Sequence, residues 1–118
     1  MTQLVACLST GKGSWAHVAR LIRNADWDHV FLITNTFGKD KFTPDERTTL
    51  IVVDTDAPVE SLRDSIHAAL KEKITDIEVA VNLYSGSGRE HMALICALQR
   101  LGLGFRVVSM EQEELQIL

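Results

Sequence analysis

The segment IEVAVNLYSGSGREHMALICALQRLG, residues 77–102, contains the pattern that decides the fold. Its first part, residues 77–85, is mostly apolar and predicts a strand that is buried on both faces. Small polar residues then form a turn, and a single cation, Arg89, precedes a largely apolar helix that Gly102 ends. A strand that passes through a short turn into a helix is the repeating unit of a parallel α/β sheet.

The same unit recurs along the chain. Apolar runs at residues 4–9, 29–34, 48–54 and 105–110 predict further strands, and residues 15–25 and 56–73 have helical periodicity. Ser14 is the expected N-cap of the first helix. We therefore expect an α/β fold over residues 1–118, formed by one Rossmann-like domain. Its open, mainly parallel sheet should have about five to six strands, with helices on both faces.

Two segments leave alternatives open. Residues 35–47 barely supply the dozen residues that a parallel crossover needs. They predict a short helix with a loop, a connection to an antiparallel neighbour, or a mobile lid. The last six residues, EELQIL, predict a short edge strand or a partner-binding tail.

The composition excludes several classes of protein. The chain has 118 residues, of which 46% are hydrophobic, enough for one domain with a real core. Its net charge of -4 argues against a surface that coats long nucleic acid. No apolar run approaches the roughly 18–20 residues of a membrane span, and the first residues lack signal-peptide features. Cys7 and Cys96 lie in apolar surroundings, which favours core packing in a reducing compartment. We expect a soluble, cytoplasmic protein with no membrane partner.

Polar residues gather where three predicted strands end. Ligands of open α/β sheets bind beyond the carboxyl ends of the strands, and residues 9–14, 34–38 and 84–89 are rich in glycine, hydroxyl and amide groups. The first and last of these turns carry a cation each, Lys12 and Arg89, and open into helices whose N–H groups attract anions. We expect a polar-ligand pocket there, with Thr34 and Asn35 supplied by the middle turn.

Other motifs fit less well. Residues 11–16 match G-x-G-x-x-A, but the acidic residue of a dinucleotide site is missing after residue 34. No metal-ligand spacing and no acid pair for proton transfer is present, so no cofactor is expected. Glu90 is expected to complement the helix dipole. For His91, ligand contact, helix packing and solvent exposure stay open.

Residues 77–102 resemble the second signature of the CRISPR-associated Rossmann-fold (CARF) domains. In that signature, a strand ending in an Asn-Leu-like pair enters a small, hydroxylated turn that carries a cation before an apolar helix. The first signature, an apolar strand with a small polar turn, is similar to residues 4–15. The matching residues of the second signature are Asn82 and Leu83, the turn residues Ser85, Gly86, Ser87 and Gly88, with the Gly-Ser order altered, and the cation Arg89.

The resemblance implies a homodimer that binds cyclic oligoadenylates, the second messengers of type III CRISPR antiviral immunity. Some members also cleave the ring without a metal ion, and a lone unit such as this is a ring nuclease, a sensor for a separate effector protein, or a piece of a longer protein. In-line attack by a ribose hydroxyl would need Lys12 or Arg89 to stabilise charge. Where exposed, Trp15 and Phe37 would stack on adenines, although core packing is the favoured role for Trp15. The implied pocket is lined by Ser9, Thr10, Gly11 and Lys12 beside Ser85, Gly86, Ser87, Gly88 and Arg89.

Two alternatives remain open without the resemblance. One is a Rossmann-like protein that binds a mononucleotide or dinucleotide. The other is a ligand-free protein-interaction module, whose contacts are the apolar helix face at residues 92–103 or the last residues of the chain.

Overall fold

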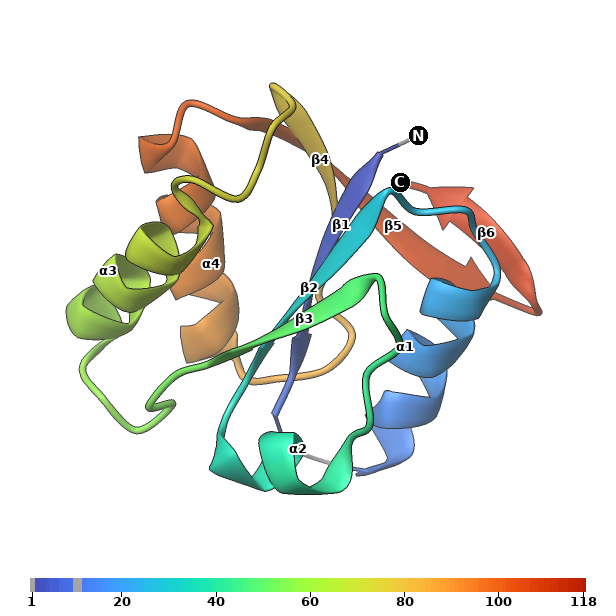
Figure 1. The fold of residues 1–118 in the computed structure, drawn as a ribbon, viewed down its shortest axis with the longest axis horizontal. Coiled ribbons are helices and arrows are strands. Elements are labelled where there is room, and N and C mark those ends of the chain that lie inside the picture. Colours follow the sequence, from blue (N-terminus) through green and yellow to red (C-terminus); the bar gives the residue numbers. More distant parts are fainter. Residues whose placement is uncertain (1, 10–11) are drawn as a thin grey trace.

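A central sheet organises the computed structural model, which describes residues 2–9 and 12–118, with Lys12 by its backbone only (Figure 1). The strand order is β3-β2-β1-β4-β5-β6, in which β1 to β5 are parallel and β6 is antiparallel to β5. This confirms the predicted Rossmann-like, mainly parallel α/β fold. The elements are β1 (Gln3–Leu8), α1 (Lys12–Arg23), β2 (His29–Thr34), α2 (Thr36–Lys41), β3 (Thr48–Val52), α3 (Val59–Leu70), β4 (Glu78–Asn82), α4 (Gly88–Arg100), β5 (Gly104–Glu111) and β6 (Glu114–Ile117).

Both faces of the sheet are covered, which explains why the strands are continuously apolar. Helices α3 and α4 lie over one face and α1 lies over the other (Figure 1). Along β1, Val5 and Cys7 point to the cluster under α3 and α4, whereas Leu4, Ala6 and Leu8 point to the cluster under α1. Burying a leucine side chain stabilises the fold by about 1.5–3 kcal/mol, so β1 contributes to both halves of the core.

The crossover at residues 35–47 forms α2 and a loop, and β3 follows as a parallel edge strand beside β2. The prediction of a short helix with a loop is confirmed, and that of an antiparallel neighbour is wrong. Asn35 caps α2, because its side chain accepts a hydrogen bond of 2.9 Å from the Gly38 N–H. A Cβ on Gly38 would overlap the Thr34 hydroxyl and lie 2.9 Å from the Leu8 carbonyl oxygen. Only glycine lets α2 approach the sheet this closely.

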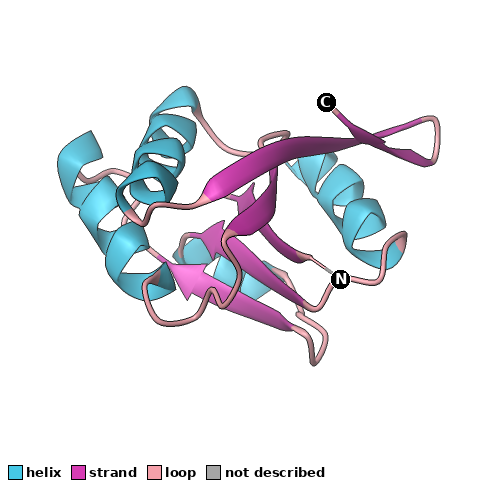
Figure 2. Ribbon diagram, turned by 90° about the horizontal axis from the view of Figure 1, so that it is seen from above, coloured by secondary structure: helices cyan, strands magenta, loops and turns pink. Residues whose placement is uncertain are grey.

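The last residues form β6, so the predicted edge strand is confirmed. The β5–β6 ribbon extends beyond the body of the molecule (Figure 2). Its turn contains two residues with positive φ, Gln112 at 50° and Glu113 at 68°.

Two boundaries near the candidate site differ from expectation. Helix α1 begins at Lys12, so Ser14 lies inside its first turn and is not the N-cap. Strand β4 ends at Asn82, earlier than predicted, and the Tyr84 N–H then donates to the Asn82 side chain at 3.2 Å.

The middle of the sheet has a short junction. β1 pairs with β2 at six positions but with β4 at three, from Leu4–Ala80 to Ala6–Asn82. Strand order reverses at this junction, which is where ligands of open α/β sheets bind.

In the described part of the chain, no helix has both the length and the apolar character that crossing a membrane requires.

Candidate ligand-binding site

The turns that follow β1 and β4 lie together, because these two strands are neighbours in the sheet. The Ser9 hydroxyl donates to a carboxylate oxygen of Glu90, and the Ser14 hydroxyl donates to that of Ser85 at 2.9 Å. These bonds join the first and the last of the three turns that the sequence singled out, and the Asn35 amide of the middle turn donates to the Ser9 carbonyl oxygen. We call the first and last turns the phosphate turns, after the anion that the sequence leads us to expect there; they are residues 9 and 12–14 after β1 and residues 83–89 after β4.

Glu90 is the centre of this arrangement and is only 3% exposed. One of its oxygens accepts from the Ser87 N–H at 3.2 Å and from the Ser87 hydroxyl at 2.8 Å. Ser87 in return accepts from the Glu90 N–H, which completes a capping box at the start of α4. The Ser-x-x-Glu spacing of residues 87–90 is the sequence signal for this box. The bond to Ser9 has no such signal, because its partner is far away in the chain.

Gly86 makes the turn after β4 possible. Its φ of 99° is one that side chains rarely adopt, and a Cβ there would lie 3.1 Å from that of Cys7. The same Cβ would lie 3.3 Å from Nε2 of His91. That nitrogen is 2.8 Å from the Ser85 carbonyl oxygen. Because a carbonyl only accepts, Nε2 carries the proton and His91 holds the turn in place.

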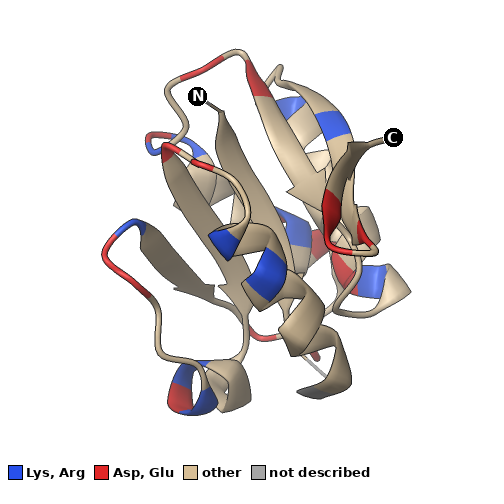
Figure 3. Ribbon diagram, turned by 90° about the vertical axis from the view of Figure 1, so that its right-hand side faces the viewer, with Lys and Arg blue, Asp and Glu red and all other residues tan. Residues whose placement is uncertain are grey.

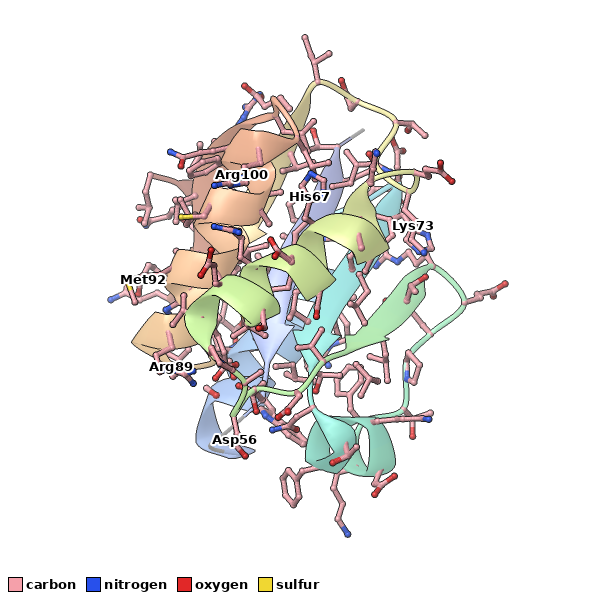
Figure 4. All side chains as sticks on the ribbon, turned by 90° about the vertical axis from the view of Figure 1, so that its left-hand side faces the viewer. Asp56, His67, Lys73, Arg89, Met92 and Arg100 are labelled. Carbon is pink, nitrogen blue, oxygen red and sulfur yellow. The ribbon has the colours of Figure 1, made fainter. Side chains whose placement is uncertain are left out.

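Arg89 has a partner that the sequence did not predict. Its guanidinium donates to the Thr55 carbonyl oxygen at 2.9 Å and also to that of Ala57. Arg89 therefore ties the start of α4 to the loop between β3 and α3, close to Asp56 (Figure 4). A guanidinium has five N–H donors, so these two bonds leave donors for a ligand as well.

The remaining predicted site residues differ in exposure. Ser9, Thr34 and Ser85 are buried, and the Thr34 hydroxyl donates to the Leu8 carbonyl. Ser87 and Gly88 are exposed, so they are the turn residues that a ligand reaches first. Thr10, Gly11 and the side chain of Lys12 lie outside the described residues, and their part in the site stays a prediction.

An open cleft of about 390 Å³ lies beside the phosphate turns, at the carboxyl ends of β2 and β3. Its volume is within the usual range of small-molecule sites, about 300–1,000 Å³. Asn35, a predicted site residue, lines this cleft. Asp54 and Asp56 also line it, and the sequence did not single them out as site residues, although they lie at the end of a predicted strand. The cleft is lined by Asn35, Thr36, Phe37, Val52, Val53, Asp54, Thr55 and Asp56.

A buried polar cluster supports the other side of the β4 turn. The Asn82 amide donates to the Val108 carbonyl oxygen at 2.8 Å and to Nε2 of His17 at 3.2 Å. The Tyr84 ring stacks on His17, with centroids 3.8 Å apart and planes within 4°.

Burial lowers the pKa of His17, and so does the charge of nearby Arg20, whereas the charge of Glu111 raises it. These two charges come from different elements: Figure 3 shows basic residues on α1 and acidic residues on the β5–β6 ribbon.

The two cysteines differ. Cys7 is fully buried, and burial together with the charge of Glu90 raises the pKa of its thiol to about 12. It is therefore an unreactive core residue, as expected. Cys96 is exposed on α4, so the prediction that it packs in the core is wrong.

No metal centre is evident in residues 2–9 and 12–118, where no group of three or more His, Cys, Asp or Glu side chains could hold an ion. Comparison with protein-family models finds no match for the chain, and comparison with curated proteins finds no similar sequence.

Proposed function

We propose that this chain is a CARF-like domain that binds a cyclic oligoadenylate across a homodimer. One observation carries the proposal. The two turns that resemble the CARF signatures lie side by side where the strand order reverses, and the Ser9–Glu90 and Ser14–Ser85 bonds join them. Residues 4–15 and residues 77–102 each resemble a ligand-binding signature of the family, and their contact supports the proposal that they form one site.

The helix starts at the phosphate turns suit an anion. Helix N-termini present N–H groups and the positive end of the helix dipole. Gly13 and Gly88 lie in the first turns of α1 and α4. Apart from chain neighbours and the backbone of the same helix, a Cβ added at either would meet no atom of the described residues within 4 Å. The start of α4 is therefore open to a phosphate, and the proposal places the same group at the start of α1.

The buried Glu90 carboxylate limits how a phosphate is held. Its negative charge lies between the two turns, where the hydroxyls of Ser9 and Ser87 and the Ser87 N–H donate to it. These bonds stabilise the charged carboxylate, and the two helix starts supply a positive potential that opposes it. Lys12, at the first residue of α1, is the proposed cation for phosphate, and Arg89 contributes its remaining donors.

A ring with repeated phosphates matches a two-fold dimer, because each copy supplies the same two turns. The proposal includes slow ring cleavage without a metal ion. A ribose 2′-hydroxyl attacks the adjacent phosphate in line and forms a 2′,3′-cyclic phosphate, while the bond from phosphorus to the 5′-oxygen of the next nucleotide breaks. The proton of the attacking hydroxyl passes through water to the departing 5′-oxygen, and Lys12 or Arg89 stabilises the developing charge. A separate effector protein would then read the bound or cleaved state.

Calorimetry with cyclic tetra- and hexa-adenylate tests the proposal, together with light scattering for the dimer and chromatography for cleavage products. We expect one ring to bind per two chains. Gly88→Asp should abolish binding, since the new carboxylate repels phosphate while favouring the start of α4. The charge-matched control is Gln99→Glu, an exposed site about 16 Å further along α4. If neither ring binds to the unmodified protein, the proposal is wrong.

A further inference from the structure

We propose that the cleft at the carboxyl ends of β2 and β3 binds the adenine base and ribose of the ligand whose phosphates lie at the phosphate turns. This rests on the proposed function and adds what distinguishes adenylate from uridylate.

The cleft and the phosphate turns are connected. Adjacent strands of a sheet are about 4.8 Å apart, so β2 and β3 lie one and two strand spacings from β1 in the order β3-β2-β1-β4. The Asn35 amide, in the cleft, donates to the Ser9 carbonyl oxygen at 3.3 Å. A second connection comes from the turn after β4, where Arg89 donates a hydrogen bond to the carbonyl oxygen of Thr55, and Thr55 also lines the cleft. The two sites therefore share walls, and one nucleotide spans both.

The charge of the lining determines which part of a nucleotide fits. Among the residues that the structure describes, the cleft is lined by two carboxylates, Asp54 and Asp56, and by no lysine or arginine. Such a lining repels phosphate and accepts hydrogen bonds from N–H and O–H groups. One oxygen of Asp54 already accepts from the Asp56 N–H at 3.0 Å, but both side chains are exposed and have further acceptor capacity.

Adenine and ribose present the donors that this lining requires. Adenine carries an exocyclic amine, whereas uracil, like thymine, has a carbonyl oxygen at the corresponding position. Ribose adds hydroxyl donors. A metal ion fits less well, since the described residues place no third acidic, His or Cys side chain with the two aspartates.

Phe37 supplies a surface for the base. Its side chain is 45% exposed, and its ring packs on Trp15 with centroids 5.8 Å apart. Val52, also at the cleft, is 40% exposed. A base stacked on Phe37 would cover apolar surface while its amine faces the aspartates.

The experiment compares cyclic tetra- or hexa-adenylate with the cyclic oligouridylate of the same size, which has the same ring and phosphates. The ratio of the two dissociation constants is the readout, because removing negative charge raises affinity for both polyanions alike and leaves the ratio unchanged. We expect the unmodified protein to prefer adenylate. In the double variant Asp54→Asn, Asp56→Asn the preference should fall at least tenfold, since an amide also donates to the uracil oxygen. Glu60→Gln, which removes an exposed carboxylate outside the lining, should keep the original ratio.

Phe37→Ala adds a second readout and should weaken adenylate binding roughly five- to 150-fold through lost stacking. The cleft proposal is overturned if adenylate binds but the unmodified protein does not discriminate, or if the double variant and Phe37→Ala both behave as the unmodified protein does. The proposed function survives either of those results. If no ring binds to the unmodified protein, the proposed function fails first, and the cleft proposal fails with it.

Discussion

The hydroxyl of Ser9 donates to the carboxylate of Glu90, a residue 81 positions later in the chain. This bond joins the turn after β1 to the start of α4, on the two sides of the point where the strand order reverses. Since Glu90 is 3% exposed and also holds Ser87, it fixes the spacing of the two phosphate turns.

Removing the hydrogen bonds of Glu90 to Ser9 and Ser87 should lower the stability of the fold. We expect Glu90→Ala to lower the free energy of unfolding by about 1.5–3 kcal/mol, because buried donors lose a charged partner. Urea denaturation measures the loss. A double-mutant cycle with Ser9→Ala isolates the bond between the turns, and coupling near zero would show that it contributes nothing.

Arg89 is expected to act on the loop between β3 and α3 before it acts on any ligand. Arg89→Ala leaves the carbonyls of Thr55 and Ala57 without their donors. Amide exchange in residues 54–57 should therefore become faster in the ligand-free protein, and affinity for the proposed ring should fall by about 1.5–3 kcal/mol. Arg100→Ala, an exposed arginine at the end of α4, is the control. Unchanged exchange in residues 54–57 would contradict the role of Arg89 in holding the loop.

His17 should make the protein less stable in mild acid. Its pKa in the folded state is lowered, chiefly by burial, from about 6.5 in the unfolded chain. The unfolded chain therefore binds a proton more readily. The contribution of neutral His17 to the free energy of unfolding is therefore complete above pH about 6.5, and it is lost as the pH falls through the folded-state pKa.

The test for His17 is the free energy of unfolding measured from pH 7.5 to 5. His17→Gln keeps an acceptor for Asn82 and does not titrate, so its curve should be flatter than that of the unmodified protein. Equal slopes for the unmodified protein and His17→Gln would contradict the assignment.

Two glycines give opposite predictions for the same substitution. Gly38→Ala forces a methyl group into the Thr34 hydroxyl and the Leu8 carbonyl, and should lower stability by about 1–3 kcal/mol, as overpacking does. Gly88→Ala meets open space and should raise stability, by up to about 1 kcal/mol from helix propensity. Thermal melting of both variants checks this, and a stable Gly38→Ala protein would show that α2 can shift away.

Local patterns were sufficient to predict the sheet but not the contacts within the site. Continuous apolar runs such as residues 29–34 predicted doubly covered parallel strands, and β2 has those bounds. The position of the two turns also follows from strand ends alone. The partners of Arg89 and Glu90 do not, because each lies on a distant element with no fixed spacing. Asp54 and Asp56 were missed for a related reason, since a cleft depends on how α2 and the β3–α3 loop pack.

The short β1–β4 junction has a consequence for how a ligand would change stability. Its three paired positions, fewer than between any other two neighbouring strands, join a first half around β1 to β3 to a second half around β4 to β6. Side chains hold these halves together where backbone bonds are few, because both core clusters contain residues of β1 and of β4. A ligand that contacts both phosphate turns would add a further connection across the same junction. At a hundred times its dissociation constant it would raise the free energy of unfolding by about 2.7 kcal/mol, so a bound ligand would supply at the strand ends what the short backbone ladder lacks.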